Sequence, residues 1–274
     1  MTLSVVIITH NEEANLARTL ESVQPLIADG KGEIIVVDSG STDRTVEIAK
    51  SFGAKIFVEE WKGYAAQKNS AIDKATGDWI LSLDADEEVG DTARNFIFLV
   101  LAGSHNVRVQ SCGFWFSRRN YFLGRWMRHG GFYPDAKLRM FIRGSGRFED
   151  RAVHEDVTLL AGQHAHEGGG ADSNGRLDLM HHSYPRLSDY ITHMNRYSSL
   201  GAEMVVAKSN GKVRFSAINI VLRPLATFVY NYFFRLGFLD GREGLLLHLY
   251  HAVYVSWKYA KAWELSRNSS SLSS

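Results

Sequence analysis

The sequence predicts an α/β domain with a parallel sheet, followed by a helical C-terminal extension. Short apolar runs alternate with helix-like segments through the first hundred residues, and apolar residues recur at helical spacing after residue 187. Strands that alternate with helices in this way are typical of βαβ units. The composition is 45% hydrophobic and 22% charged with four prolines, which excludes a disordered or collagenous chain.

The individual elements follow from short local patterns. Strands are predicted at residues 3–9, 33–38, 55–58 and 79–83. Helices follow the first three strands, with Asn11 expected to cap the first helix and Asp43 the second, and with the third over residues 64–75. Ligands of parallel sheets bind beyond the carboxyl ends of the strands. We therefore expect Thr9, Asp38 and Asp84, each at such an end, to share one crevice.

Charge and cysteine content narrow the function classes. Residues 1–104 carry 17 acidic and 9 basic side chains, whereas residues 105–274 carry 13 acidic and 22 basic ones. The first part therefore suits a metal ion and the second an anionic partner. Cys112 is the only cysteine, so a disulfide and a cysteine zinc site are excluded and a reducing compartment is expected. Neither a targeting segment nor a membrane-spanning helix is expected.

An acidic run follows the fourth predicted strand. Four acids occupy the five positions from Asp84 to Glu88. An isolated Asp-x-Asp is commonly a helix cap or a solvated turn, but this run stands where a ligand should bind. Hard oxygen ligands suit Mg²⁺ or Mn²⁺, and Mg²⁺ takes few carboxylates together with substrate phosphates. No glycine-rich phosphate loop follows the first strand, which disfavours a dehydrogenase or an NTPase.

Motifs that occur in order along the chain resemble a known family. The first four are Thr9–Glu13, Val37–Asp43, Gln67–Asn69 and Leu83–Asp86. Together they resemble glycosyltransferase family 2, the inverting enzymes of GT-A fold. Three later motifs are similar to bacterial lipopolysaccharide-core glucosyltransferases: Gly130–Asp135, Lys137–Phe141 and Val153–Glu155. Ser39 and Lys68 depart from the family, where aspartate and arginine are common, and this leaves the base preference open.

The resemblance implies a GT-A (Rossmann-like) mixed, mostly parallel sheet flanked by helices, and a role for each matching residue. The nucleotide-sugar donor, expected to be a UDP-sugar, would be bound by Thr9, Asn11, Glu12, Asp38, Lys68 and Asp84. A divalent metal, Mg²⁺ or Mn²⁺, would be bound by Asp86, with His182 and His181 as further ligands. The catalytic base would be Glu155, with Asp156 in reserve. The acceptor would be bound by Arg139 and His154.

Alternatives to these roles remain open on the residues alone. Glu155 could pair with Arg151, and the two adjacent histidines could be ordinary hydrogen-bonded residues. In the catalytic hypothesis, the metal neutralises the departing diphosphate and a carboxylate on the opposite face deprotonates the acceptor hydroxyl, which gives inversion in one displacement.

Basic and aromatic side chains interleave between residues 105 and 151, a mixture that suits nucleic acid or a phosphorylated saccharide. No nucleic-acid motif accompanies them, so an anionic glycolipid acceptor is expected and nucleic acid is not. Residues 211–274 hold eight basic residues against three acids among many aromatic ones. This favours helices at a membrane interface, with a hairpin packed on the sheet domain or a dimer contact as the alternative.

The expected protein is thus a transferase that moves a hexose, glucose from UDP-glucose, to a lipopolysaccharide inner-core sugar. It would be cytoplasmic and peripheral on the inner face of the bacterial cytoplasmic membrane. The rivals are a family 2 transferase for a capsule, polyprenyl phosphate or protein acceptor, and a non-catalytic nucleotide-sugar or glycolipid binding protein. The expected domains are a catalytic domain (1–186, with halves 1–104 and 105–186), a helical extension (187–265) and a disordered tail (266–274).

Overall fold

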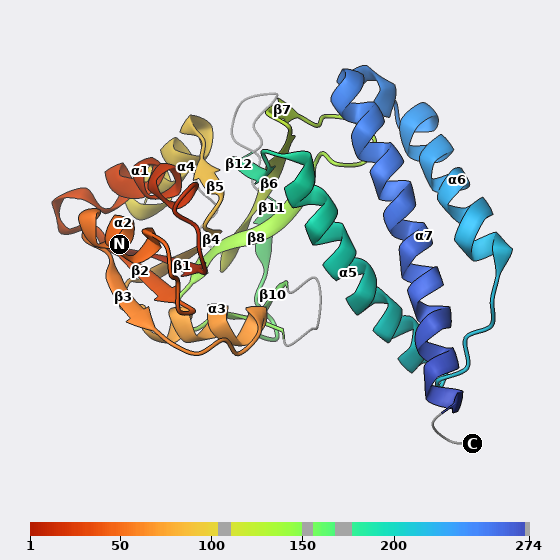
Figure 1. Cartoon of the computed structure of the whole chain (residues 1–274). Coiled ribbons are helices and arrows are strands. Elements are labelled where there is room, and N and C mark those ends of the chain that lie inside the picture. Colours follow the sequence, from red (N-terminus) through yellow and green to blue (C-terminus); the bar gives the residue numbers. More distant parts are fainter. Residues whose placement is uncertain (104–110, 150–155, 168–176, 272–274) are drawn as a thin grey trace. The chain divides into compact units, whose positions relative to one another are not determined.

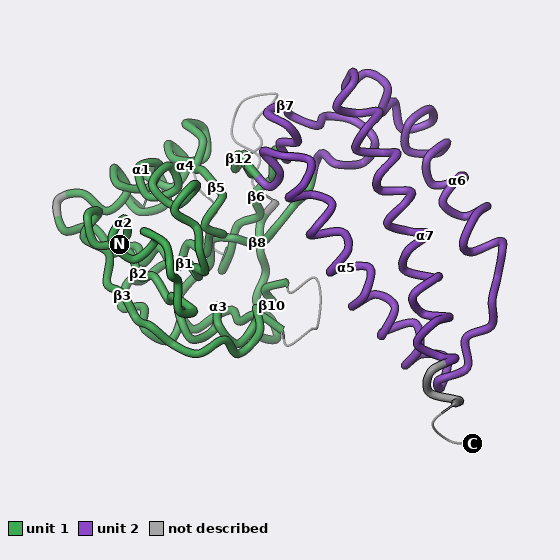
Figure 2. Tube along the Cα trace, viewed as in Figure 1, with its two compact units in different colours: residues 1–119, 135–182 green, residues 120–134, 183–274 purple. Residues whose placement is uncertain are grey.

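The structure is a computed structural model that describes residues 1–103, 111–149, 156–167 and 177–271 (Figure 1). The chain divides into two compact units (Figure 2). The sheet unit comprises residues 1–119 and 135–182, and the helical unit comprises residues 120–134 and 183–274. The predicted domain limits at residues 104 and 186 concern catalytic halves and an extension, which this division into compact units does not test, and they stay predictions.

The sheet is mixed, and its parallel part has the predicted strands. These are β1 (Leu3–Thr9), β2 (Gly32–Asp38), β3 (Lys55–Val58) and β4 (Trp79–Asp84). The remaining strands of the sheet are β5 (Glu87–Val89), β6 (Gly113–Phe122), β7 (Arg125–Trp126), β8 (Asp135–Ile142), β11 (Ala165–Glu167) and β12 (Asp178–Tyr184). The strand order is β3-β2-β1-β4-β8-β6-β12-β5, with β11 and β7 pairing with β6. A separate ribbon pairs β9 (Gly146–Phe148) with β10 (Val157–Leu159).

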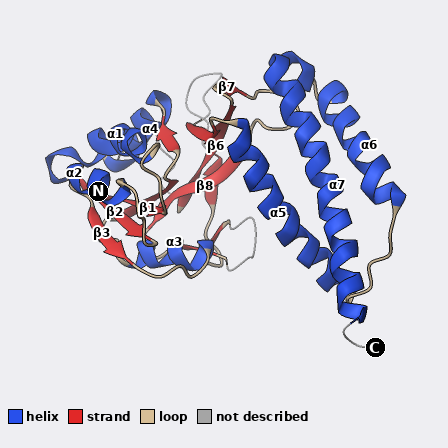
Figure 3. Cartoon of the chain, in the orientation of Figure 1, coloured by secondary structure: helices blue, strands red, loops and turns tan. Residues whose placement is uncertain are grey.

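Helices cover both faces of the parallel strands (Figure 3). They are α1 (Leu16–Ile27), α2 (Thr45–Ser51), α3 (Tyr64–Asp73) and α4 (Asp91–Leu101), with a short 3₁₀ turn at Ala28–Gly30. Successive residues of a strand point to opposite faces. Val5 and Ile7 accordingly pack in the cluster that includes α1 and α4, while Val6 packs in the cluster that includes α3. With both faces buried, the strand ends remain as the place where polar side chains can meet a ligand.

The helical unit confirms the predicted helical C-terminal region. Its helices are α5 (Leu187–Lys208), α6 (Arg223–Val229) and α7 (Gly241–Ser271), with π-helical turns at Ile218–Leu222 and Tyr230–Phe234 and a 3₁₀ turn at Gly237–Asp240. Helix α7 packs against both α5 and α6 (Figure 1). Residues 266–271 continue α7, whereas the sequence predicted a disordered tail there. No helix in the described ranges is both long and apolar enough to cross a membrane.

Candidate active site

The carboxyl ends of the central parallel strands bring three predicted site residues together. Thr9 is paired with Asp38 across β1 and β2, and Ile8 is paired with Asp84 across β1 and β4. The Thr9 hydroxyl donates a hydrogen bond of 2.8 Å to the Asp38 carboxylate. The structure therefore places Thr9, Asp38 and Asp84 at one edge of the sheet, which we call the strand-end site. That they share a ligand crevice stays a prediction.

Asp38 is buried and organises the turn that follows β2. Its Oδ1 accepts hydrogen bonds from the backbone N–H groups of Gly40 at 2.9 Å and Ser41 at 2.8 Å. Its Oδ2 accepts from the hydroxyls of Thr9 and Ser41. An ionised carboxylate has about four acceptor positions, so these bonds fix its orientation and use most of its capacity.

Asn11 does not cap a helix, contrary to the prediction. Helix α1 begins at Leu16, and Asn11 adopts a left-handed backbone conformation with φ of 56°. Asparagine tolerates this conformation better than most residues. The Asn11 Oδ1 accepts a hydrogen bond of 2.8 Å from the Thr42 backbone N–H, and the Asn11 N–H donates to the Ser41 hydroxyl at 2.8 Å. Asn11 therefore ties the loop after β1 to the loop after β2.

Glu12 lies close enough to the acidic run to feel its charge. Its Oε2 accepts a hydrogen bond of 3.0 Å from the Asn15 amide. Burial raises the pKa of the Glu12 carboxyl, the bond from Asn15 lowers it, and the charges of Asp86, Asp43 and Asp84 raise it further. A cation bound at this site would relieve that repulsion.

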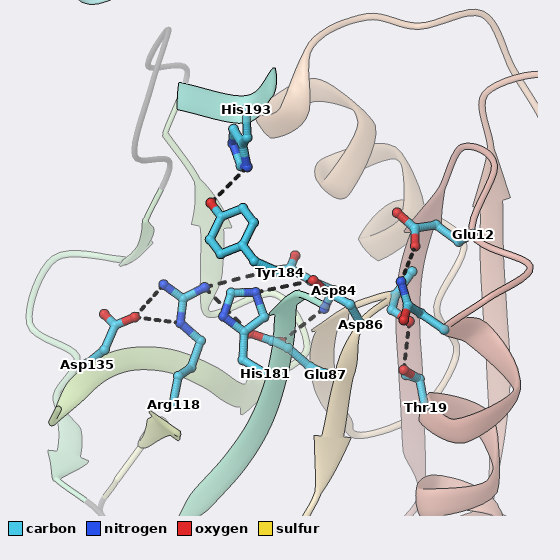
Figure 4. Close-up of polar contacts among 12 residues, drawn as sticks. Glu12, Thr19, Asp84, Asp86, Glu87, Arg118, Asp135, His181, Tyr184 and His193 are labelled. Atoms are coloured by element: carbon cyan, nitrogen blue, oxygen red, sulfur yellow. Dashed lines mark hydrogen bonds and ion pairs between the residues drawn. The ribbon is translucent and has the colours of Figure 1, made fainter. Parts of the chain in front are cut away.

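Asp84 is enclosed by cationic side chains, as Figure 4 shows in part. The Lys68 Nζ lies 2.8 Å from Oδ1, the Arg139 Nη2 lies 2.6 Å from Oδ2, and the Arg118 Nη1 lies 3.9 Å from Oδ2. Burial acts to raise the pKa of Asp84, but Arg139, Lys68 and Arg118 hold that pKa well below its usual value. Lys68 and Asp84, which were predicted separately, are thus direct partners.

Glu87 and Arg118 complete this network and were not predicted as site residues. Glu87 is fully buried, and its Oε1 lies 2.5 Å from the Arg139 Nη2 and 3.7 Å from the Arg118 Nη1. Arg118 also pairs with Asp135 at 2.5 Å, its neighbour across β6 and β8 (Figure 4). The position of Glu87 in the acidic run could have indicated a site residue. Its arginine partners could not be found from the sequence, because they depend on the register of distant strands.

Arg139, which was predicted to bind the acceptor, is buried among carboxylates in this structure, and its role toward the acceptor stays a prediction. Its side chain is only 4% exposed and is paired with Asp84 and Glu87. Burial acts to lower the pKa of Arg139, but the two carboxylates raise it above its ordinary value. In this structure Arg139 is a counter-ion of Asp84 and Glu87 inside the sheet unit.

Asp86 and His181 form a pair beside the strand-end site (Figure 4), because β12 runs antiparallel to β5. The His181 Nε2 lies 3.4 Å from the Asp86 Oδ2. Burial acts to raise the pKa of Asp86, but His181 lowers it below its usual value. Asp86 in turn raises the pKa of His181 against the effect of burial. His182 lies instead beside Glu88, with 3.3 Å between Nε2 and Oε2.

The described residues contain no group of three or more His, Cys, Asp or Glu side chains placed to hold a metal ion. Beside the strand-end site, Asp86 and His181 bring one carboxylate and one imidazole together. Such a set fits a hard divalent ion that takes its remaining oxygens from phosphates and water. Of the two histidines predicted as metal ligands, His181 has its side chain against Asp86 and His182 has its side chain against Glu88. Their role as ligands stays a prediction.

The predicted catalytic carboxylates are placed in part. Asp156 is described, and its Oδ1 lies 2.9 Å from the Nζ of Lys137, with the Asp156 side chain 41% exposed. Glu155 and His154 lie outside the described residues. The role of base, for either Glu155 or Asp156, therefore stays a prediction.

Comparisons with known proteins show the family of the chain. Residues 4–131 match the family model of glycosyl transferase family 2. The lipopolysaccharide core biosynthesis glycosyltransferase LpsC of Rhizobium meliloti (strain 1021) is 30% identical over 269 residues, which cover 96% of this chain and 92% of LpsC. The uncharacterized glycosyltransferase RT0209 of Rickettsia typhi is 30% identical over 276 residues, covering 97% and 88%. The chain belongs to glycosyl transferase family 2 and is a glycosyltransferase.

A solved structure shows the same fold. The mannosyltransferase PcManGT from Pyrobaculum calidifontis, determined in complex with GDP-Man and Mn²⁺, superposes with a TM-score of 0.54 at 18% identity. The match covers 96% of this chain and 87% of PcManGT. The predicted fold class, a GT-A mixed sheet flanked by helices with a helical C-terminal region, is thereby confirmed.

Proposed function

We propose that this glycosyltransferase moves a hexose, glucose from UDP-glucose, to an inner-core sugar of lipopolysaccharide or a similar anionic glycolipid. The observation that carries the proposal is the gathering of Thr9, Asp38 and Asp84 at one sheet edge, next to Asp86 and His181. The name of LpsC supports the acceptor class, and the nucleotide sugar and Mn²⁺ bound to PcManGT support the donor class and the ion.

The residues present fit a divalent ion. The pKa of Asp86 lies below its ordinary value, so this carboxylate is ionised at neutral pH and offers oxygen ligands. His181 beside it offers a nitrogen ligand once it has lost its proton. A bound ion would neutralise the negative charge that develops on the departing diphosphate.

The remaining residues would position the donor and remove the acceptor proton. Asp38 and Thr9 would contact the base or ribose from the turn after β2, and the Asn11–Glu12 loop would lie beside them. Lys68 and Asp84 would approach the ribose and phosphates as a fixed ion pair. Glu155, with Asp156 in reserve, would accept the proton of the acceptor hydroxyl on the face opposite the leaving group, which inverts the sugar carbon.

We further propose that the helical unit rests on the inner face of the cytoplasmic membrane. Several of its large apolar side chains are more than half exposed: Phe215, Ile218, Val221, Leu222, Leu225, Tyr230, Phe233 and Phe234. Monomeric soluble proteins rarely expose contiguous apolar patches of large size. An acceptor anchored in the membrane would give these side chains an apolar phase to enter.

A donor assay tests the catalytic proposal. UDP or GDP release is measured with UDP-glucose, UDP-galactose and GDP-mannose, each with Mn²⁺, with Mg²⁺ and with EDTA, in the presence and absence of lipopolysaccharide core. We expect release from UDP-glucose that depends on metal and rises with the acceptor. A protein that binds these donors with metal and never releases the nucleotide, even with acceptor, would be a binding protein instead.

The Glu155→Gln variant tests the base. It should bind UDP with the affinity of the wild type and lose transfer, while Glu47→Gln, an exposed glutamate on α2, serves as the matched control. Turnover retained in Glu155→Gln together with loss in Asp156→Asn would move the role to Asp156.

A further inference from the structure

A shallow cavity of about 280 Å³, open to solvent, lies on the surface of the helical unit and is formed by two segments far apart in the sequence. Residues 128–131 and 133 supply one wall, and residues 234–236 supply the other. This volume is at the lower limit of the about 300–1,000 Å³ that hold drug-sized ligands, and it suits a single phosphate with part of a headgroup.

Hydrogen bonds hold the two walls together. The His129 backbone N–H and its Nδ1 each lie 2.8 Å from a different carboxylate oxygen of Asp240. The Gly130 N–H donates a hydrogen bond of 2.8 Å to the Arg235 backbone carbonyl. The cavity is therefore a fixed feature of the helical unit.

Glycine is required where the walls meet. Gly131 has a φ of +88°, and a Cβ there would lie 2.1 Å from the Nη1 of Arg235. Such a distance is far inside van der Waals contact, so a side chain at position 131 would displace the guanidinium of Arg235, and it would also be strained at this φ. The sequence motif Gly130–Asp135 thus has a structural purpose, which is to make room for the head of Arg235.

The two arginines of the cavity lack acidic partners. Within the described residues no carboxylate forms an ion pair with Arg128 or Arg235, whereas the nearby Arg125 pairs with Glu243 at 3.7 Å. Arg128 instead lies over the Trp126 ring, 4.2 Å from its centroid, and Arg235 lies 5.9 Å from the centroid of Tyr230. Guanidinium groups held by aromatic faces keep their N–H donors available, and their planar fork matches a phosphate.

Apolar side chains border the same cavity and face solvent. Phe234 and Leu236 belong to its lining and are 74% and 46% exposed. Unpaired arginines beside exposed apolar side chains complement a phosphate that is attached to an acyl chain, because both parts of such a lipid then find a partner.

We propose that this cavity binds the phosphate of a membrane lipid headgroup through Arg128 and Arg235, while Phe234 and Leu236 enter the acyl boundary. The inference rests on the proposed membrane partner of the helical unit. It adds a defined headgroup site to that proposal, with a ligand of stated chemistry.

The test uses the full chain and vesicles of phosphatidylcholine with or without about one fifth phosphatidic acid, measured by co-sedimentation. The wild type should bind the vesicles that contain phosphatidic acid. The double variant Arg128→Ala/Arg235→Ala should bind them about a hundredfold more weakly, since it loses both charge and bidentate pairing. The control Arg242→Ala removes an exposed arginine of the same unit outside the cavity and should cost at most about fivefold, the effect of one basic residue near an anionic surface.

Three results would overturn the proposal. If each arginine removed lowers the vesicle affinity equally in the cavity variant and in the control variant, the binding comes from diffuse surface charge and not from the cavity. Binding of the double variant at the level of the wild type would exclude the site, and binding of inorganic phosphate without binding of vesicles would exclude a lipid as its source. Circular dichroism checks the fold of each variant, and Arg128→Lys and Arg235→Lys, which keep the charge, serve if the alanine variants unfold. Metal-dependent UDP release by the wild type reports separately on the catalytic proposal.

Discussion

Arginines are placed for opposite purposes in the two units. In the sheet unit, Arg118 and Arg139 pair with carboxylates of the chain itself. In the helical unit, Arg128 and Arg235 lie against aromatic rings, and no carboxylate in the described part of the chain pairs with them. The comparison shows that an arginine paired with a carboxylate has its counter-charge within the chain, whereas an arginine held by an aromatic ring keeps its N–H donors for another anion. The carboxylates of the sheet unit thus neutralise Arg118 and Arg139, whereas the proposed counter-charge of Arg128 and Arg235 is an external anion.

The largest expected effect tests the buried ion pairs of the sheet unit. Arg139→Met would remove the cation that lies closest to both the buried Glu87 and the partly buried Asp84, and it should lower the free energy of unfolding by about 3 kcal/mol. Arg147→Met removes the arginine of an ion pair with Asp73, in which both side chains are more than half exposed, and should cost at most about 1 kcal/mol. Urea unfolding of both variants measures the difference. Equal decreases in the free energy of unfolding for the two variants would mean that the buried ion pairs of Arg139 stabilise the fold no more than the exposed pair of Arg147.

The next effect concerns the proposed metal ligand. Asp86→Asn removes the charge that would hold the ion and should lower kcat/KM for donor transfer about 10²–10³-fold, as loss of a principal electrostatic contact does. Asp91→Asn, at a side chain that is 92% exposed on α4, should leave kcat/KM within about twofold. Steady-state kinetics at saturating Mn²⁺ compares them. Full activity of the Asp86→Asn enzyme would contradict the proposal that Asp86 binds a catalytic metal ion.

A smaller effect tests the packing behind the cavity of the helical unit. Gly130 has a φ of +68°, and a Cβ there would lie 1.9 Å from the Cε1 of His248, so Gly130→Ala combines backbone strain with a clash. Gly124→Ala has the strain alone, since nothing lies within 4 Å at its φ of +80°. We expect Gly130→Ala to cost about 2 kcal/mol more than Gly124→Ala in chemical unfolding. Equal costs would show that the His248 ring moves aside freely.

The smallest effect is a pH dependence of the helical unit. Burial, aided by the charge of His251 and opposed by that of Asp240, lowers the pKa of His248 from 6.5 to about 4. As the pH falls, His248 is therefore protonated in the unfolded chain at a higher pH than in the folded chain. The stability that the neutral His248 contributes is fully present above pH 6.5 and is lost as the pH falls toward 4. Between these limits the wild type should lose on the order of 1–2 kcal/mol more than His248→Asn, which cannot take up the proton. The free energy of unfolding is measured at several pH values for both proteins. If it changes with pH by the same amount in the wild type and in His248→Asn, the prediction is contradicted.

Local patterns in the sequence were enough to predict the parallel half of the fold and its strand ends. Strands β1 to β4 match the predicted ranges within one residue, because each is a short apolar run with clear ends. Thr9, Asp38 and Asp84 followed from those ends.

Long-range pairing set the rest, and it was not predictable from local patterns. The contacts of Arg118 and Glu87 depend on how β6, β8 and β12 align with distant strands. Arg139 was assigned to the acceptor because its charge alone did not reveal its burial. Asn11 was assigned as a cap because the bonds that hold it come from Ser41 and Thr42, thirty residues away.

The central claim is that the strand-end site binds a nucleoside diphosphate through a divalent ion held by Asp86. A crystal grown with UDP and Mn²⁺, with diffraction recorded on the manganese absorption edge, tests it most directly. The account predicts an anomalous manganese peak at the Asp86 carboxylate, with the UDP bound beside Asp38 and Asp84. A manganese peak elsewhere in the protein, with UDP bound away from Asp38 and Asp84, would contradict it.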